Sequence, residues 1–234
     1  MAFILPAGSQ GGLVTGYVGT SATSGVVIRA TTYTPQGTGA QRSVKSTSTL
    51  DAAAGTGART ITINYLDTSF NLKSETITLN GTTAVNTVNT DIAYLESIVV
   101  ASVGSTGGNQ GTISIFTTTA GGGSAWGSIA ANDNKTFWAH HYVPAGVTCY
   151  PLSLVGGSTV TAGGLTINRS GDPSNANSPQ LNVAGTYIHA GGNYVRHNFE
   201  VPIPIVGPDF IWLVERPTAI TASTAYGTFE YIQF

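Results

Sequence analysis

The segment Arg59-Thr-Ile-Thr-Ile-Asn-Tyr-Leu66 decides the fold class, because its polar and apolar residues alternate with a period of two. In a β-strand this alternation places the isoleucines on one face and the threonines on the other. The same period recurs in Ser74-Glu-Thr-Ile-Thr-Leu79 and in Gly111-Thr-Ile-Ser-Ile-Phe116. Threonine is β-branched and suits a pleated surface, and its hydroxyl hydrates the outer face without charge. The sequence therefore predicts a packed all-β protein.

On either side of that segment, turn residues separate further short apolar runs. Asp67 and Asn71 are turn formers that predict a hairpin connection, and Asn80-Gly81 is a strong turn signal. Many short strands in series are typical of a sandwich or barrel. We therefore predict a jelly-roll-like antiparallel β-sandwich. Its other strands are expected at Ser97–Val103, Thr112–Thr117, Ala125–Ile129, Lys135–Val143, Val147–Leu154, Gly164–Asn168, Tyr194–Ile205, Phe210–Glu215 and Tyr226–Phe234.

Two segments depart from this pattern. Between Val85 and Leu95, apolar residues recur at i, i+3, i+7 and i+10, which predicts one short helix. Pro202 and Pro204 stand at alternate positions and remove two backbone donors from any ladder. That segment is therefore expected to be an edge strand or to leave the sheet.

The first 58 residues differ in composition from the rest. Residues 1–58 are predicted to form an extended arm that other chains order, whereas residues 59–234 form the sandwich. A loose extra hairpin on the same sandwich is the alternative for the arm, and the glycines within 120–124 leave open two sandwich subdomains divided there. Within the arm, strands are expected at Leu13–Val18 and Gly25–Tyr33, between flexible links at Gly8–Gly12, Thr34–Ala40 and Ala52–Gly57.

Composition limits the functional classes. The formal net charge of −2 and the scattered nine Lys and Arg residues provide no surface for a polyanion, so we expect no nucleic-acid partner. No run approaches the roughly 20 apolar residues of a membrane helix. The apolar start Met1–Pro6 is too short for a secretion signal, which favours assembly in a cytoplasm. The single cysteine, Cys149, excludes an intrachain disulfide and is predicted to be buried.

Residues that could bind a metal lack the spacing of known sites. Adjacent residues in a strand point to opposite faces, so the histidine pair at 140 and 141 cannot easily chelate one ion. Capping of a sheet edge, or a position at a subunit interface, is the expected role of one of them. We therefore predict no metal among the candidates, which are His140, His141, His189, His197, Asp133 and Asp172, the two aspartates being in turn sequences.

Catalytic signatures are also missing. No Gly-x-Ser-x-Gly elbow is present, and Cys149 has no histidine beside it in the sequence. Ala120-Gly-Gly-Gly-Ser124 lacks the lysine and helix of a phosphate-binding loop. A pair of catalytic carboxylates for glycoside cleavage remains an alternative among the 11 acidic residues, although none of them has a distinctive sequence context. We predict that the protein is not an enzyme and that it has no catalytic residue and no cofactor.

The three tryptophans raise the alternative of a sugar-binding platform. Trp138 and Trp212 lie in apolar-rich strands, where core or interface packing is the usual role, and Trp126 begins another predicted strand region. Core packing is therefore the expectation, with carbohydrate binding as the rival.

Several stretches taken together resemble virion structural proteins of tailed bacteriophages. In the first half these are Thr60–Asp67, Glu75–Val85 and Asn109–Ile113, and in the second half Val143–Tyr150, Thr166–Arg169, Phe199–Ile203 and Gly227–Ile232. The resemblance covers roughly residues 59–234 and leaves the arm unmatched. It implies a β-sandwich head or tail protein without catalytic residues.

Within that family, the resemblance favours a capsid decoration (cement) protein that binds and stabilises the head shell. The implied partners are the major capsid protein or other virion proteins, the implied location is the virion, and a homo-oligomer, taken as a trimer, is expected. A tail-fibre or baseplate module that binds a receptor or glycan is the alternative, and a sandwich-fold glycan hydrolase or lyase is a third class. Deleting the arm is expected to leave the sandwich folded and to weaken assembly.

Overall fold

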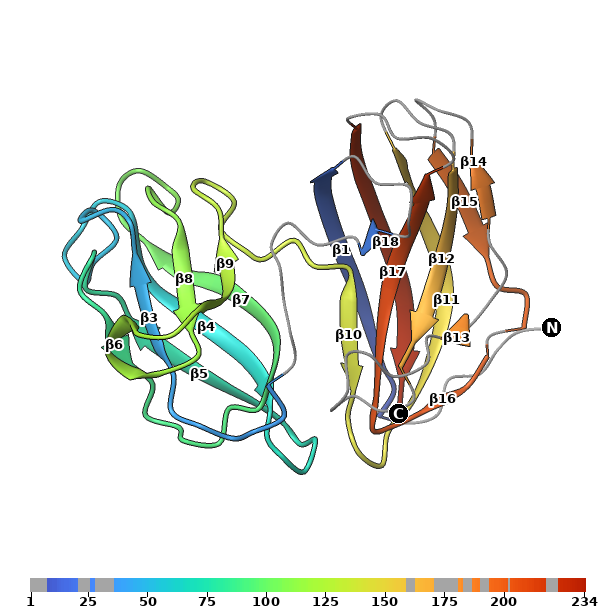
Figure 1. Cartoon of the computed structure of the whole chain (residues 1–234), viewed down its shortest axis with the longest axis horizontal. Helices are drawn as coiled ribbons and strands as arrows, with labels where there is room; N and C mark the ends of the chain where they lie inside the picture. The colour runs from blue at the N-terminus through green and yellow to red at the C-terminus, as the bar shows by residue number, and fades with distance from the viewer. Residues whose placement is uncertain are drawn as a thin grey trace. The chain divides into compact units, whose positions relative to one another are not determined.

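The chain folds into two compact units, and the strands described in each unit form antiparallel sheets (Figure 1). Unit 1 comprises residues 1–30 and 138–234, and unit 2 comprises residues 31–137. Every pair of strands in the described residues is antiparallel, which confirms the all-β prediction. The computed structural model describes residues 8–20, 26–27, 36–158, 163–170, 181–182, 187–189, 194–201, 203–217 and 223–234. No helix in these ranges is long and apolar enough to cross a bilayer.

Unit 2 contains two sheets, of three and four strands. Both sheets turn fully buried isoleucines inward, such as Ile61 and Ile63 from one and Ile113 and Ile115 from the other. The three-stranded sheet has the order β5 (Leu72–Thr78), β4 (Ala58–Leu66), β7 (Tyr94–Val103). The four-stranded sheet has the order β6 (Val85–Asn86), β3 (Ser43–Ser46), β8 (Ile113–Phe116), β9 (Ala125–Ile129), with a short 3₁₀ turn at Thr119–Gly121.

Unit 1 is a larger sandwich with a core drawn from both of its sheets, including Leu154 and Phe229 from one and Ile167 and Leu213 from the other. The five-stranded sheet has the order β1 (Gln10–Thr20), β18 (Ser223–Gln233), β11 (Thr148–Ser158), β15 (Tyr194–Asn198), with β16 (Ile205–Val206) also on β11. The six-stranded sheet has the order β10 (His140–Val143), β17 (Asp209–Pro217), β12 (Gly163–Arg169), β13 (Leu181–Asn182), with β14 (Tyr187–His189) on β12 and β2 (Val26–Val27) on β17.

The two ends of the chain meet in one sheet. Strand β1 pairs with β18 along its whole 11-residue length, from Gln10 opposite Gln233 to Thr20 opposite Ser223. Strand β3, also within the expected arm, pairs with β6 and β8 of unit 2. The observed division, with unit 2 inserted between β2 and β10, therefore differs from the expected boundaries at residue 58 and near 120–124. Local composition cannot reveal that β1 pairs with a strand at the other end of the sequence.

The helix expected between Val85 and Leu95 is wrong, because this segment contains only the start of β7 and the short β6. Its backbone groups find partners outside the segment. The amides of Val88 and Asn89 donate to the two carboxylate oxygens of Glu75, at 2.6 and 3.0 Å. The Thr and Asn residues here favour such side-chain and long-range bonds over a helical ladder.

The predicted hairpin after β4 is confirmed. The Oδ1 atom of Asp67 accepts hydrogen bonds from the amides of Ser69 (2.8 Å) and Asn71 (3.0 Å), and Phe70 takes the left-handed conformation with φ of 61°. Pro204 lies outside the strands, as expected for a residue without an amide donor. Pro202 and most of the strand expected at 25–33 lie outside the described residues.

Candidate interaction surface

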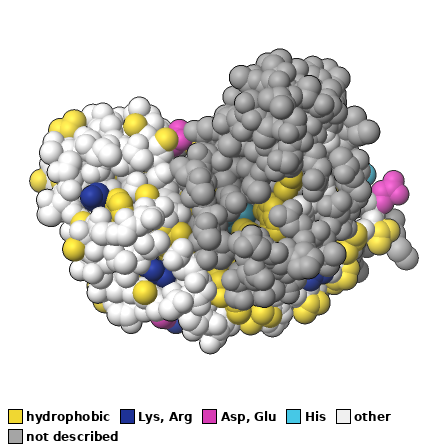
Figure 2. All heavy atoms as spheres, in the orientation of Figure 1, with side chains coloured by type: hydrophobic (Ala, Val, Ile, Leu, Met, Phe, Trp, Pro, Cys, Tyr) yellow, Lys and Arg dark blue, Asp and Glu magenta, His cyan; other side chains and the backbone are white. Residues whose placement is uncertain are grey.

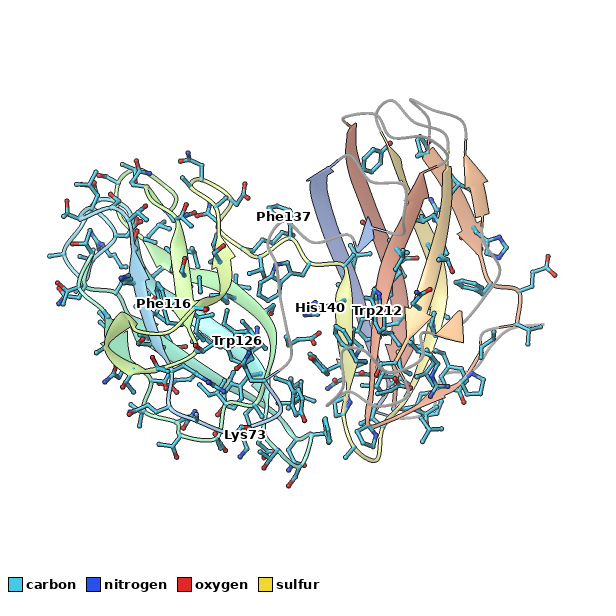
Figure 3. The ribbon with its side chains drawn as sticks, in the orientation of Figure 1. Lys73, Phe116, Trp126, Phe137, His140 and Trp212 are labelled. Carbon is cyan, nitrogen blue, oxygen red and sulfur yellow. The ribbon has the colours of Figure 1, made fainter. Side chains whose placement is uncertain are left out.

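The two adjacent histidines of β10 lie on opposite faces of the strand, as the sequence predicts. The Nε2 atom of His141 is 2.9 Å from Oε1 of Gln233, and its ring stacks on Tyr231 with centroids 4.2 Å apart. The ring of His140 lies instead among aromatic rings, 5.2 Å from Trp138 and 5.2 Å from Phe210 (Figure 3). Both histidines are buried.

The remaining metal candidates are not brought together where the structure describes them. His197 packs edge-on against Phe199 at 5.0 Å, and Asp133 lies in a turn between Asn132 and Asn134, which both have positive φ. In the described ranges no three His, Cys, Asp or Glu residues are grouped as a metal site requires. Asp172 and the side chain of His189 lie outside the described residues.

The cysteine and the tryptophans lie in the interior. Cys149 is fully buried in the core of unit 1, as predicted. Trp126, Trp138 and Trp212 are each at most 3% exposed, and Figure 3 labels Trp126 in unit 2 and Trp212 on β17 of unit 1. These rings are therefore buried, and none of the three presents an exposed stacking surface for a sugar.

One buried carboxylate that the sequence analysis missed organises a loop of unit 2. Asp51 is fully buried and accepts four hydrogen bonds. Its Oδ1 atom accepts from the amides of Ala58 (2.9 Å) and Gln110 (2.8 Å). Its Oδ2 atom accepts from the hydroxyl of Ser46 (2.6 Å) and the amide of Gly111 (2.9 Å). A carboxylate whose oxygens are engaged in this way holds a loop together and is not available to a substrate.

The segment expected to be a flexible link, Ala52–Gly57, wraps this carboxylate. A Cβ atom on Gly57 would collide with Oδ1 of Asp51, and one on Gly55 would collide with the carbonyl oxygen of Leu50. These glycines are therefore required for close packing and do not mark a loose linker.

A buried arginine was missed in the same way. The guanidinium of Arg42 donates to the carbonyl oxygens of Thr38 (2.8 Å), Ile92 (2.8 Å) and Thr117 (2.5 Å). It also lies over the Trp126 ring, 4.7 Å from the centroid. Its donors thereby tie together three segments of unit 2, and no local pattern in the sequence signals this role.

The charged cluster of unit 2 lies beside the β4–β5 hairpin, near the labelled Lys73 in Figure 3. The Lys73 ammonium is 2.9 Å from Oδ2 of Asp67 and 2.6 Å from Oδ2 of Asp91. The Tyr65 hydroxyl donates to Oδ1 of Asp91 at 3.0 Å. Four titratable groups therefore share one network of hydrogen bonds.

The protonation of this cluster is fixed at neutral pH. Burial alone would raise the pKa of Asp67, but hydrogen bonds from Lys73, Asn71 and Ser69 outweigh it and lower the pKa to about 2. The hydrogen bond from Lys73 also lowers the pKa of Asp91, and both carboxylates raise the pKa of Lys73. Burial and the bond to Asp91 raise the pKa of Tyr65 to about 12. An amine held protonated is a poor nucleophile, and carboxylates held ionised are poor acids, so the network acts structurally.

The outer face of the five-stranded sheet in unit 1 carries apolar side chains, in contrast to the charged cluster of unit 2. They lie at the end of the sheet that holds the C-terminus. Val206 of β16 lies opposite Thr148 of β11, and Thr148 exchanges backbone hydrogen bonds of 2.9 and 3.2 Å with Phe234. These three residues form one row across the sheet. Val206 is 63% exposed and Phe234 is 38% exposed.

The next rows along the strands continue this surface. Ile232 lies between Tyr150 and Gly11, and Leu13, which is 64% exposed, lies opposite Glu230. The alternating residues of β11 and β18, such as Cys149 and Phe229, belong to the core, so these rows face outward. Figure 2 shows hydrophobic side chains along the lower edge of unit 1, where Figure 1 places β16 and the C-terminus. We name this surface the C-terminal patch, formed by the exposed Leu13, Val206 and Phe234 with Tyr150 and the 6% exposed Ile232 between them.

A groove of about 430 Å³ opens beside the patch. Strands β1 and β18 and the bulged part of β11 supply its walls, which are Gly11, Gly12, Leu13, Leu152, Glu230, Tyr231 and Ile232.

The chain was compared with protein-family models, curated proteins and solved structures. The sequence matches no protein-family model and no curated protein. Two solved structures, of the infectious bursal disease virus Gx strain and Gt strain, contain chains similar to this one at 11% and 13% identity. The alignments cover 97% of this chain and 72% of each viral chain, with TM-scores of 0.28 and 0.27. A likeness this weak establishes neither a shared fold nor a shared function.

Proposed function

We propose that this chain is a non-enzymatic structural protein of a tailed-bacteriophage virion, and specifically a capsid decoration protein that binds the head shell. The partner would be the major capsid protein or another virion protein, and the chain would act as a homo-oligomer, taken as a trimer. A structural protein of this kind needs a stable sandwich and a surface for its partner, with no reaction centre.

The observation that carries the proposal is the C-terminal patch. Contiguous exposed apolar side chains are uncommon on monomeric proteins and mark surfaces that bind another macromolecule. Here Leu13, Val206 and Phe234 share one outer sheet face, and Val201, 84% exposed, lies a few residues before β16. Covering a side chain of this size contributes roughly 1.5–3 kcal/mol of hydrophobic stabilisation.

The behaviour of the polar groups supports the non-enzymatic part of the proposal. The distinctive titratable groups of the described residues serve structural bonds, as in the fourfold engagement of Asp51 and the ion pairs of Lys73. Catalytic centres instead keep such groups available to a substrate at a suitable protonation state.

Binding of the purified chain to empty phage heads tests the proposal. Sedimentation of heads with bound protein gives the stoichiometry, and the double variant V206S/F234S should bind at least tenfold more weakly while its thermal unfolding changes little. The matched control is Val88→Ser, which removes a side chain that is 84% exposed in unit 2 and should leave binding unchanged. Binding to tails or to a glycan in place of heads would instead support the fibre or baseplate alternative, and equal binding by all three proteins would contradict the role of the patch.

A further inference from the structure

The groove beside the C-terminal patch exists because one position of β1 carries no side chain. Gly11 lies opposite Ile232 on the outer face, and a Cβ atom there would meet nothing closer than the carbonyl oxygen of Tyr231, at 3.9 Å. The neighbouring outward residue, Leu13, does project, and Leu152 projects from the bulge in β11. The result is an open hollow lined mainly by apolar groups.

One wall of this hollow is charged. Glu230 lies opposite Leu13, and its Oε2 atom accepts a hydrogen bond of 2.7 Å from the hydroxyl of Ser153. That bond orients the carboxylate and uses one of its oxygens, whereas a carboxylate can accept about four hydrogen bonds. None of the described residues that line the groove is basic. An occupant must therefore match an apolar channel that has a negative charge at one wall.

We propose that the groove binds the side chain of a lysine or arginine presented by the partner protein. The aliphatic stem of such a side chain packs along Leu13, Leu152 and Ile232 while its charged head donates to Glu230. The proposal rests on the proposed function, since the partner is the protein that covers the C-terminal patch. It adds that this protein presents a cationic side chain beside its apolar contact.

Titration of the isotope-labelled full chain with N-acetyl-lysine methylamide, followed by backbone NMR, tests the inference. A ligand of this size is expected to bind with a dissociation constant on the order of 1 mM. Shifts should concentrate at Leu13, Glu230 and Ile232. The norleucine analogue keeps a similar stem without the ammonium, so it should bind about tenfold more weakly, since hydrogen bonds to charged groups are the stronger ones.

Two variants separate charge from shape. Glu230→Gln should weaken lysine binding about tenfold and leave norleucine binding unchanged, whereas Gly11→Leu should fill the hollow and abolish both. Glu200→Gln makes the same charge change at an exposed site of unit 1, and Asn198→Leu adds a leucine to the same outer sheet face, so both are matched controls. Equal binding of the two probes, or wild-type lysine binding by Glu230→Gln, would overturn the inference.

The two proposals fail separately. If the chain binds heads through the C-terminal patch but the lysine probe binds without dependence on Glu230, the groove assignment is wrong and the virion role remains. If the lysine probe binds as described but the chain binds no virion component, the virion role is wrong and the chemistry of the groove remains.

Discussion

The outer faces of the two sandwiches contrast in chemistry. On the three-stranded sheet of unit 2, polar side chains bond to one another in pairs across neighbouring strands, and Val99 lies opposite Thr62 among them. On the five-stranded sheet of unit 1, the C-terminal patch leaves Leu13, Val206 and Phe234 exposed. Hydroxyl and amide pairs suit a face that stays in water, whereas an apolar row suits a face that is covered. The pairs of unit 2 are Thr60–Ser102 (2.6 Å), Thr62–Thr76 (3.0 Å) and Asn64–Ser97 (3.0 Å).

The largest expected effect comes from removing residues 1–20. This deletion removes β1, exposes the backbone of β18 along the edge, and takes Val14 away from the core of unit 1. Unit 1 should lose its cooperative fold while unit 2 keeps it, which reverses the result expected for a free arm. Hydrogen exchange read by mass spectrometry checks this, since β18 and β11 should lose protection and β4 should retain it. Unchanged protection of β18 would show that β1 is dispensable after all.

Unit 2 should be most sensitive at Asp51. The substitution Asp51→Ala leaves one hydroxyl and three amide donors buried without their acceptor, so we expect a loss of about 3 kcal/mol or more. Urea denaturation monitored by tryptophan fluorescence measures it. Glu200→Gln, on the surface of unit 1, should change stability by less than about 0.5 kcal/mol. A comparable loss in both variants would mean that the Asp51 bonds contribute little.

Period-two alternation was enough to predict strand type for most of the chain. The strand expected at Ala125–Ile129 matches β9, and the Asp67 turn forms as expected. Alternation predicts strands well because successive side chains of a strand point to opposite faces, so the pattern depends only on neighbouring residues. Burial of Cys149 followed from its apolar neighbours in the same local way.

Long-range pairing could not be predicted from such patterns. The pairing of β1 with β18 joins strands from opposite ends of the sequence. The roles of Asp51 and Arg42 depend on backbone groups up to 60 and 75 residues away. The C-terminal patch likewise arises from the register of three strands, since Val206 and Phe234 meet only across Thr148.

Lowering the pH of the solution should have a smaller effect on stability, through the charged cluster of Lys73. The pKa of Asp67 is lowered from 3.8 to about 2 in the folded chain, so its contribution to stability is fully present above about pH 4. That contribution is lost as the pH falls toward 2. Asp67→Asn should therefore be less stable than the wild type by about 1–2 kcal/mol at pH 7, and this difference should shrink by pH 2. A difference that stays constant between pH 7 and pH 2 would contradict the ion-pair assignment.

The smallest effect is expected on the hydroxyl face of unit 2. Thr62 and Thr76 bond to each other at the surface, and valine keeps the shape of threonine and suits a strand, so T62V/T76V should change the free energy of unfolding by less than about 0.5 kcal/mol. Binding to phage heads should not change, because this face stays in water under the proposal, whereas V206S/F234S should weaken it. Urea denaturation and head sedimentation on the same preparations measure both quantities. If the valine pair alters head binding as strongly as the serine pair, both faces contact the partner, and the contrast between the two units no longer locates the binding surface.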